Sequence, residues 1–322
     1  GDLEDGAANK ALLCELRQRL LGLGYKHSEV LRRLGLASLV QLLNAQSEEL
    51  EAQLGWVDSD SLATEVGKEP LVELIRLFLL RSMLPLDDVV ALLGQEICSW
   101  LLGHGALSCF RNADGQLLSK EAAVHLVTEG SAHATMVAFA NVALWPVEED
   151  LLIATDFYET AYLEGDFEPV MYLGADSYAL VDGAPRLPVV ARALDLCCGS
   201  GVQGIVALRY YAEHVTFQDL NERALRFTRF NAVLNGMAER CRYVQGNICD
   251  VDLVSQLASY GPFDAVLANP PFIPNPDGTN TAAGAMYSSG GEDGERVYEA
   301  LVLASCRHLM ALGGRLAVVS CT

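Results

Sequence analysis

Three glycines and an acidic residue share the spacing of a loop that binds a nucleotide-like ligand. Gly199, Gly201 and Gly204 form the pattern G-x-G-x-x-G directly after an apolar run, and Asp219 ends the next apolar run. Glycines at this spacing let the backbone approach a ligand closely, and the acid accepts hydrogen bonds from ribose hydroxyls. The pattern predicts a ligand that contains a ribose, which is true of both NAD and S-adenosylmethionine.

Asp195 distinguishes between these two ligands. It lies four residues before Gly199, and we expect its carboxylate at the mouth of the site. A carboxylate there repels the pyrophosphate of NAD and attracts the ammonium group of a methionine moiety, which favours S-adenosylmethionine. Two structural alternatives stay open: Asp195 as a turn or capping residue, and Asp219 as an acid at a helix N-terminus.

A regular alternation of strands and helices positions these residues. Strands are expected at 189–198, 214–220, 241–248, 263–272 and 313–321, and helices at 202–212, 222–236 and 294–312. Strands that alternate with helices form a mainly parallel sheet covered on both faces. The predicted fold class is therefore α/β, with a doubly wound, Rossmann-like sheet.

The part of the chain before this alternation has a different pattern. Apolar residues at helical spacing predict a mainly helical segment up to residue 105, and short β-rich runs follow at 105–160. That order resembles a winged-helix arrangement, and a Pro/Gly linker lies at 182–188. We predict a helical N-terminal domain (1–105), a β-rich extension with the linker (106–187), and the α/β domain (188–322).

The charge is unevenly distributed. Residues 1–187 contain 12 basic and 29 acidic residues, a net charge of −17, whereas residues 188–322 contain 10 and 13, a net charge of −3. Nucleic acids need a basic surface that releases their counterions. The acidic half is therefore a poor platform for a nucleic-acid partner, although a small basic patch in the second half stays open.

Cysteine usage and hydropathy predict a cytoplasmic protein. The nine cysteines include no C-x-x-C pair, so we expect reduced thiols and no metal site. No run of eighteen apolar residues occurs, and the first ten residues are polar and acidic. The sequence therefore predicts neither a membrane span nor a signal peptide.

The motifs of residues 188–322 resemble those of the class I S-adenosylmethionine-dependent methyltransferases. The matching stretches are D-L-C-C-G-S-G, D-L after the second strand, L-N-G, and N-P-P-F. The branch with N-P-P-[YF] includes release-factor glutamine N5-methyltransferases, adenine N6-methyltransferases and small-domain guanine N2 rRNA enzymes. "GGEDGERVYEAL" (290–301) further resembles the glutamine enzymes.

This resemblance implies a set of cofactor-binding residues. They are Asp195, Cys197, Gly199, Gly201, Asp219, Leu220, Asn247, Ile248 and Asn269. Asn247 stands where the family usually has an acid that meets the adenine amino group, and an amide can still form that hydrogen bond. Cys197 and Cys198 replace smaller residues, and we interpret them as packing at a buried strand end.

The resemblance also implies that "LANPPF" (267–272) carries the chemistry. Asn269 Oδ1 and the carbonyl of Pro270 can accept hydrogen bonds from the two N–H groups of a planar nitrogen, which frees its lone pair for methylation. The prolines fix the loop so that both acceptors point one way, and Phe272 offers a flat face for the substrate. Residues 275–294 suit a lid, with a plain linker as the alternative.

The expected function is N-methylation of a planar nitrogen, with a protein glutamine side chain as the favoured acceptor. RNA guanine N2 or adenine N6 and a small-molecule amine are the alternatives. Outside this class, an NAD-dependent oxidoreductase is disfavoured because residues 188–322 contain no lysine for a Tyr-x-x-x-Lys pair. A catalytically silent scaffold is the other rival. The predicted partner is a protein or small-molecule acceptor rather than nucleic acid or membrane.

The resembled fold has seven strands, but the chain ends directly after the fifth. An apolar fifth strand with an unpaired edge is a liability that natural sheets avoid. We therefore expect this strand at a sheet edge, and a further segment or subunit that completes the sheet.

Overall fold

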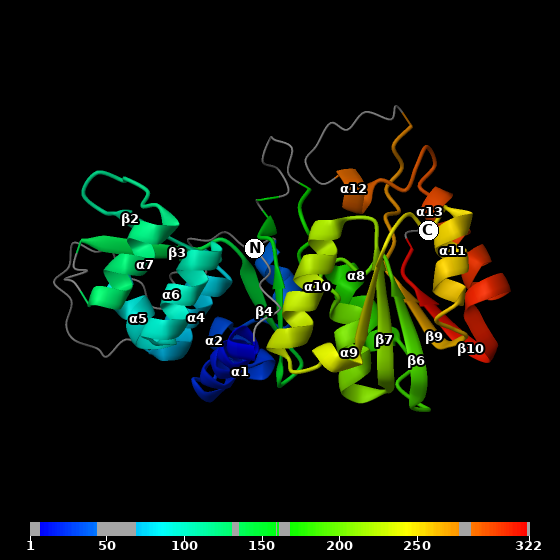
Figure 1. The fold of residues 1–322 in the computed structure, drawn as a ribbon, viewed down its shortest axis with the longest axis horizontal. Coiled ribbons are helices and arrows are strands. Elements are labelled where there is room, and N and C mark those ends of the chain that lie inside the picture. Colours follow the sequence, from blue (N-terminus) through cyan, green and yellow to red (C-terminus); the bar gives the residue numbers. More distant parts are fainter. Residues whose placement is uncertain are drawn as a thin grey trace. The chain divides into compact units, whose positions relative to one another are not determined.

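The computed structural model describes residues 7–43, 69–130, 135–158, 160, 168–276 and 285–320. The chain divides into two compact units, Gly1–Ile153 and Ala154–Thr322 (Figure 1). Among the described residues, none of the helices is both long enough and apolar enough to cross a membrane.

The first unit begins with helices. These are α1 (Ala7–Gly22), α2 (His27–Leu34), the 3-10 turn η1 (Leu39–Leu43) and α4 (Pro70–Phe78). Leucines three and four residues apart on α1 are buried, which confirms the helical spacing in the sequence. Tyr25, fully buried, donates its hydroxyl to the carbonyl of Leu144 at 2.7 Å and so fixes the turn after α1.

A small antiparallel sheet follows in this unit, with helices between its strands. The strands are β1 (Leu84–Pro85), β2 (Leu107–Arg111) and β3 (Met136–Ala140), in the order β1-β3-β2. The helices are α5 (Leu86–Leu93), α6 (Gln95–His104) and α7 (Lys120–Glu129). The helix α7 is absent from the sequence-based expectation. A two-stranded sheet of β4 (Ala143–Val147) and β5 (Leu151–Thr155) follows, and β5 runs across the division between the units.

The second unit contains a five-stranded parallel sheet, which confirms the predicted fold class. Its strands are β6 (Val190–Leu196), β7 (Ala212–Asp219), β8 (Cys241–Gln245), β9 (Phe263–Ala268) and β10 (Met310–Val318), in the order β10-β9-β6-β7-β8. Leu196 is in register with both Gln218 and Ala268, so the carboxyl ends of the three central strands lie at one edge. The strand order reverses between β6 and β9, and open α/β sheets bind ligands at such a switch point.

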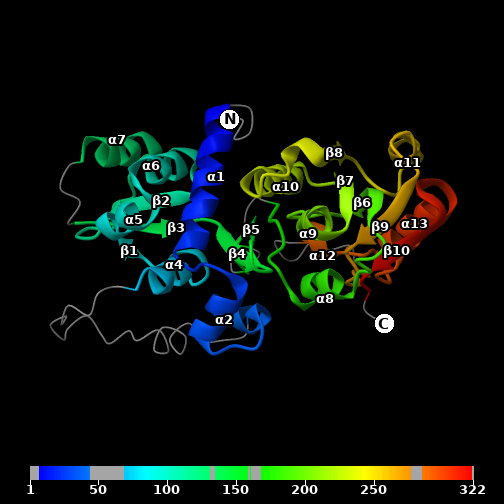
Figure 2. The ribbon, with the colours of Figure 1, turned by 90° about the horizontal axis from the view of Figure 1, so that it is seen from below.

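Helices cover both faces of this sheet. They are α8 (Ala175–Gly183), α9 (Val202–Tyr210), α10 (Glu222–Leu234), α11 (Val251–Ala258) and α13 (Arg296–Ala304). Figure 2 shows α11 and α13 on one face and α8, α9 and α10 on the other. Buried apolar side chains from α11, α13 and the sheet form one core, which includes Leu253, Phe263 and Leu301.

Three elements of the second unit differ from the sequence-based expectation. The helix α11 was not expected, and β10 begins three residues earlier than the predicted start at 313. The helix α8 lies before the predicted domain start at 188, yet it packs on α9 in the second unit, where Gln203 Nε2 donates to the carbonyl of Ser177 at 3.0 Å. The predicted division into three parts stays a prediction.

In the described part of the chain, β10 lies at one edge of the sheet with β9 as its neighbour. The proposed completion of the sheet by a further segment or a subunit stays a prediction.

Candidate functional site

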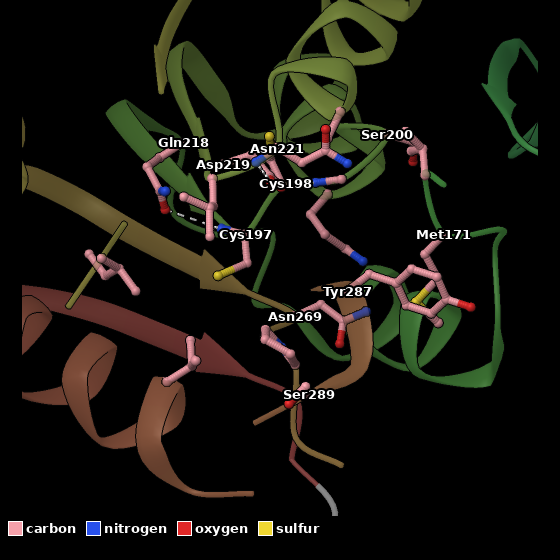
Figure 3. Close-up of a pocket in the computed structure, with 18 of the residues that line it drawn as sticks. Met171, Cys197, Cys198, Ser200, Gln218, Asp219, Asn221, Asn269, Tyr287 and Ser289 are labelled. Carbon is pink, nitrogen blue, oxygen red and sulfur yellow. Dashed lines mark hydrogen bonds between the residues drawn. The ribbon is translucent and has the colours of Figure 1, made fainter. Parts of the chain in front are cut away.

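The carboxyl ends of four parallel strands open into one pocket of about 270 Å³. The turns after β6, β7, β8 and β9 each contribute lining residues, among them Cys197, Asp219, Asn247 and Asn269. Figure 3 shows Cys197 and Asp219 on one side of this pocket, and Met171 and Tyr287 on the opposite side. The sequence-predicted residues therefore meet at the switch point, as the fold class requires.

The glycine loop turns sharply between β6 and α9. Gly199 and Gly201 have φ angles of +55° and +79°, which L-residues rarely adopt. A Cβ at Gly201 would lie 2.5 Å from Cγ2 of Thr228, whereas a Cβ at Gly199 would meet nothing within 4 Å. The backbone at Gly199 therefore faces open space, which a ligand can approach closely.

Two buried side chains of α10 hold this loop in place. Thr228 Oγ1 donates to the carbonyl of Gly199 at 2.9 Å, and Asn231 Nδ2 donates to the carbonyl of Ser200 at 2.9 Å. Thr228 and Asn231 are both fully buried. The loop conformation is thus fixed by hydrogen bonds before any ligand binds.

The two cysteines before the glycines line the pocket, but neither thiol is activated. Burial raises the pKa of both Cys197 and Cys198 well above the ordinary value, and the nearby carboxylates of Asp219 and Asp195 raise it further. Cys198 Sγ lies 3.5 Å from Thr228 Oγ1. Their geometry fits packing and shape rather than nucleophilic chemistry.

Asp195 lies deeper than the sequence predicts. It is 0% exposed and does not line the pocket, so its expected place at the mouth is wrong; the residue belongs to the buried part of β6. Its Oδ2 accepts the N–H of Gly204 at 2.8 Å, while Oδ1 finds no hydrogen-bond partner among the described residues. Burial and then the charge of Asp219 raise its pKa well above the usual range, although the Gly204 hydrogen bond opposes this.

Asp219 lies at the end of β7 and lines the pocket. Its Oδ2 accepts the N–H of Gly199 at 2.8 Å, and its Oδ1 accepts the N–H of Asn221 at 2.8 Å. Burial raises the pKa of Asp219, and these backbone hydrogen bonds lower it. The backbone N–H of Leu220 is a third partner, so the carboxylate keeps one acceptor position of the kind that binds a ribose hydroxyl.

The turn after β8 contributes two further residues of the predicted cofactor set. Asn247 and Ile248 line the pocket, and so does Leu220, which follows β7 and is exposed. Asn247 Oδ1 accepts the N–H of Cys249 at 3.0 Å, which orients the side-chain amide within its own turn.

The N-P-P-F segment follows β9 as predicted, but it contributes fewer residues to the pocket than expected. Asn269 and Pro271 line the pocket, whereas Pro270 is buried and Phe272 is half-buried, and neither of these two residues lines it. Phe272 instead lies against a tight turn, where a Cβ at Gly294 would be 2.5 Å from its carbonyl oxygen. A planar platform from Phe272 is therefore not part of the pocket in this conformation.

Asn269 has a partner that the sequence did not indicate. Its Nδ2 donates to Oδ2 of Asp176 at 2.8 Å, across 93 residues of chain. Asp176 lies in the first turn of α8, which precedes the predicted α/β domain. The predicted lid at 275–294 falls partly outside the described residues; within them, Tyr287, Ser289 and Gly291 line the pocket.

Residues 169–173 form a wall of the pocket that the sequence did not predict. Asp156, 2% exposed, is clamped by the Arg223 guanidinium through two hydrogen bonds, of which Nη2–Oδ1 is 2.7 Å, and its Oδ2 also accepts the N–H of Val170 at 2.7 Å. This ion pair ties the wall to α10. A bidentate pair of this kind is stronger than a neutral hydrogen bond.

Aromatic side chains gather at this wall. Tyr172 and Tyr158 pack edge-to-face with ring centroids 4.8 Å apart. Tyr172 and Tyr287 both line the pocket. Burial raises the pKa of the Tyr172 hydroxyl to about 12, with smaller contributions from Tyr287, Tyr158 and Asp176. The hydroxyl therefore stays protonated at neutral pH.

The comparisons with known proteins agree with this geometry. Residues 177–292 match the family described as Methyltransferase small domain. This match overlaps the part of the chain whose motifs resemble the S-adenosylmethionine-dependent methyltransferases. The match begins within α8, so it includes Ser177, the neighbour of Asp176, as well as the four strands β6 to β9.

Three curated relatives share segments with the chain. The tRNA1(Val) (adenine(37)-N6)-methyltransferase of Shewanella sp. (strain MR-4) is 34% identical over 104 residues, 32% of this chain and 42% of that protein. The release factor glutamine methyltransferase of Chlorobaculum tepidum is 38% identical over 82 residues, 25% of this chain and 27% of that protein. The ribosomal protein L11 methyltransferase of Lachnospira eligens is 36% identical over 77 residues, 24% of each chain.

The chain thus spans less than half the length of these relatives. The names of these relatives differ in the methyl acceptor.

Proposed function

We propose that this chain is an S-adenosylmethionine-dependent N-methyltransferase that acts on a planar nitrogen, with a protein glutamine amide as the favoured acceptor. The observation that carries the proposal is the position of Asn269. Its amide lines the same pocket as the glycine loop and Asp219, and its Nδ2 is held by Asp176 at 2.8 Å. A hydrogen-bond acceptor, Oδ1, is thereby kept beside the cofactor pocket.

The residues present fit S-adenosylmethionine better than NAD. Asp219 offers a carboxylate acceptor for a ribose hydroxyl, and Asp195 places a buried carboxyl with an orphaned Oδ1 behind the glycine loop. A methionine moiety is cationic at its ammonium and sulfonium groups, so it would favour ionisation of this carboxyl, whereas a pyrophosphate would oppose it. Asn247 and Ile248 would meet the adenine.

When bound, the cofactor supplies a methyl group on a positively charged sulfur, and the carbon–sulfur bond breaks with its electron pair on sulfur. The chain's own residues prepare the acceptor. Asn269 Oδ1 would accept a hydrogen bond from an N–H of the acceptor nitrogen and orient its lone pair; the nitrogen later releases one proton to water. The same role of the Pro270 carbonyl stays a prediction, since Pro270 is buried and does not line the pocket. This is catalysis by positioning and electrostatics rather than by a general base.

An RNA base is the second candidate acceptor. The Shewanella relative is named for adenine N6 of a tRNA, and an exocyclic amino group has the same planar N–H geometry as an amide. The chain's net charge of −20 favours a protein or small-molecule acceptor over RNA. The predicted cytoplasmic location stays a prediction.

One experiment tests the donor and the acceptor together. Calorimetry with S-adenosylmethionine and with NAD should show binding of the first alone. Tritiated S-adenosylmethionine is then incubated with the protein and with separated protein, RNA and small-molecule fractions of a cell extract. We expect label in the protein fraction, on a glutamine nitrogen; label in RNA would establish the second candidate. Binding of NAD alone, or label in none of the fractions, contradicts the proposal.

A further inference from the structure

Asp176 is the one carboxylate that contacts the side chain of Asn269 among the described residues. We propose that Asp176 is a positioning residue that fixes the Asn269 amide with Oδ1 toward the methyl acceptor, and that its charge makes this oxygen a stronger acceptor. This inference rests on the proposed function and deepens it, because the orientation restricts the class of substrate.

The hydrogen bond determines which way the amide faces. An ionised carboxylate can only accept, so the group that Asn269 turns toward Asp176 must be its NH₂. The reversed amide would place two oxygens 2.8 Å apart. The orientation of Oδ1, which is often ambiguous for an asparagine, is therefore set here by chemistry.

Asp176 is itself held in position. It is half-buried in the first turn of α8, and its Oδ1 packs against the backbone of Gly174, where an added Cβ would lie 2.5 Å away. The adjacent Ser177 is buried, and its carbonyl accepts from Gln203 on α9 at 3.0 Å. The carboxylate is thus anchored to the helix that begins at the glycine loop.

This orientation selects the substrate. With Oδ1 toward the acceptor, the site recognises a nitrogen that carries at least one N–H, such as a primary amide or an amino group. A tertiary amine or a carboxylate offers no N–H, and Oδ1 would repel the carboxylate. As the nitrogen forms its bond to carbon it becomes positively charged, and the negative charge of Asp176, relayed through the polarised amide, stabilises that charge.

A first experiment reads the orientation without any substrate. Side-chain amide NMR of ¹⁵N-labelled protein follows the Asn269 NH₂ signals, which are assigned by their loss in Asn269→Ala. We expect Asp176→Ala to shift both proton frequencies as the charge-assisted hydrogen bond disappears. Asp182→Asn, an exposed acid on the same helix, is the matched control and should leave them in place. Unchanged Asn269 signals in Asp176→Ala would overturn the proposal.

A second experiment reads the chemistry. The probes are an acetylated Gly-Gln-Gly amide peptide and an adenosine-containing RNA oligonucleotide, with tritiated S-adenosylmethionine. On the probe that the wild type methylates, Asp176→Asn should lower kcat by about tenfold to a hundredfold, since an asparagine there both donates and accepts and no longer fixes the amide. The affinity for S-adenosylmethionine and the KM for the probe should change by less than about threefold.

The double variant Asp176→Asn/Asn269→Ala should be no slower than Asn269→Ala alone, because Asp176 acts only through that amide. Independent, multiplicative effects would overturn the positioning role. If the wild type binds no S-adenosylmethionine and labels neither probe, the proposed function fails, while the NMR result still decides the orientation. If the wild type is active and Asp176→Asn is equally fast, the inference alone fails.

Discussion

The Asn231 side chain donates to the carbonyl of Ser200 at 2.9 Å and so ties the middle of α10 to the glycine loop. The same Nδ2 donates to the carbonyl of Ala154 at 2.9 Å, and Oδ1 accepts the N–H of Ala154 at 2.7 Å. One fully buried amide therefore satisfies three backbone groups, two at the end of β5 and one in the loop.

We expect Asn231→Ala to lower the free energy of unfolding by about 2–4 kcal/mol, because it leaves buried backbone groups unpaired. The loop loses one of its two supports, so the affinity for S-adenosylmethionine should also fall. Denaturant melts and calorimetry measure the two effects. Arg226→Ala, an exposed position on the same helix, is the control and should change neither. A variant that unfolds more easily but binds normally would show that Thr228 alone holds the loop.

A second prediction separates backbone strain from steric overlap. Gly201 and Gly236 both have positive φ, +79° and +70°, but only at Gly201 would a Cβ meet a neighbour, 2.5 Å from Thr228. Gly236→Ala should therefore cost about 1 kcal/mol of stability and keep cofactor affinity. Gly201→Ala should displace the loop and abolish measurable binding in calorimetry. Equal affinity of the two variants would contradict the role given to the loop.

A third prediction concerns Asn269. The variant Asn269→Ala should keep its affinity for S-adenosylmethionine, because the ribose and methionine contacts come from other strands. Its turnover should fall by roughly a hundredfold or more, since an acceptor positioned for the transition state is lost. Single-turnover methyl transfer measures this, with Asn275→Ala, which is next to Ser289, as the control. Unchanged turnover would remove Asn269 from the catalytic group.

The fourth prediction follows from the raised pKa of Asp195. A buried carboxyl whose pKa is raised in the folded state keeps a proton that the unfolded chain releases. Its favourable contribution is fully present below the unfolded value of 3.8 and is lost as the pH rises from there through the folded pKa. The free protein should therefore lose stability over this range, and Asp195→Asn should flatten the pH dependence and raise Tm at pH 7.

The same variant should weaken binding of S-adenosylmethionine, because it removes the carboxyl that a cationic ligand would ionise. Thermal melts from pH 4 to pH 8, with and without S-adenosylmethionine, measure both effects. A Tm at pH 7 lower than that of the wild type would show that the Asp195 carboxylate stabilises the free fold.

The sheet could be predicted from sequence because each strand of this unit is a short apolar run that ends at a turn signal. The regular spacing of these runs also placed Asp219, Asn247 and Asn269 at the same edge. Periodicity failed at α11, a helix of eight residues, and at the start of β10, where Met310 follows a single π-helical turn. Short apolar segments of this kind fit a strand and a helix equally well.

The parts of the site that depend on tertiary contacts could not be predicted. Asp176 and Asn269 are 93 residues apart, and Asp156 and Arg223 are 67 apart, and no local pattern indicates either pair. The prediction that Asp195 lies at the mouth of the pocket was wrong for a related reason. The sequence places Asp195 near the end of a strand, but the surrounding packing decides whether its carboxyl group faces the pocket or the interior.

The unpaired oxygen of Asp195 also has a consequence for the protein in the cell. A buried carboxyl oxygen without a partner lowers the stability of the free fold, and a ligand that binds only the folded chain adds to the free energy of unfolding as its concentration rises. Cellular proteases degrade the unfolded fraction continuously, and a change of 1–2 kcal/mol alters steady-state abundance several-fold. Starvation for the methyl donor should therefore deplete this protein itself, and abundance would follow donor supply without any change in transcription.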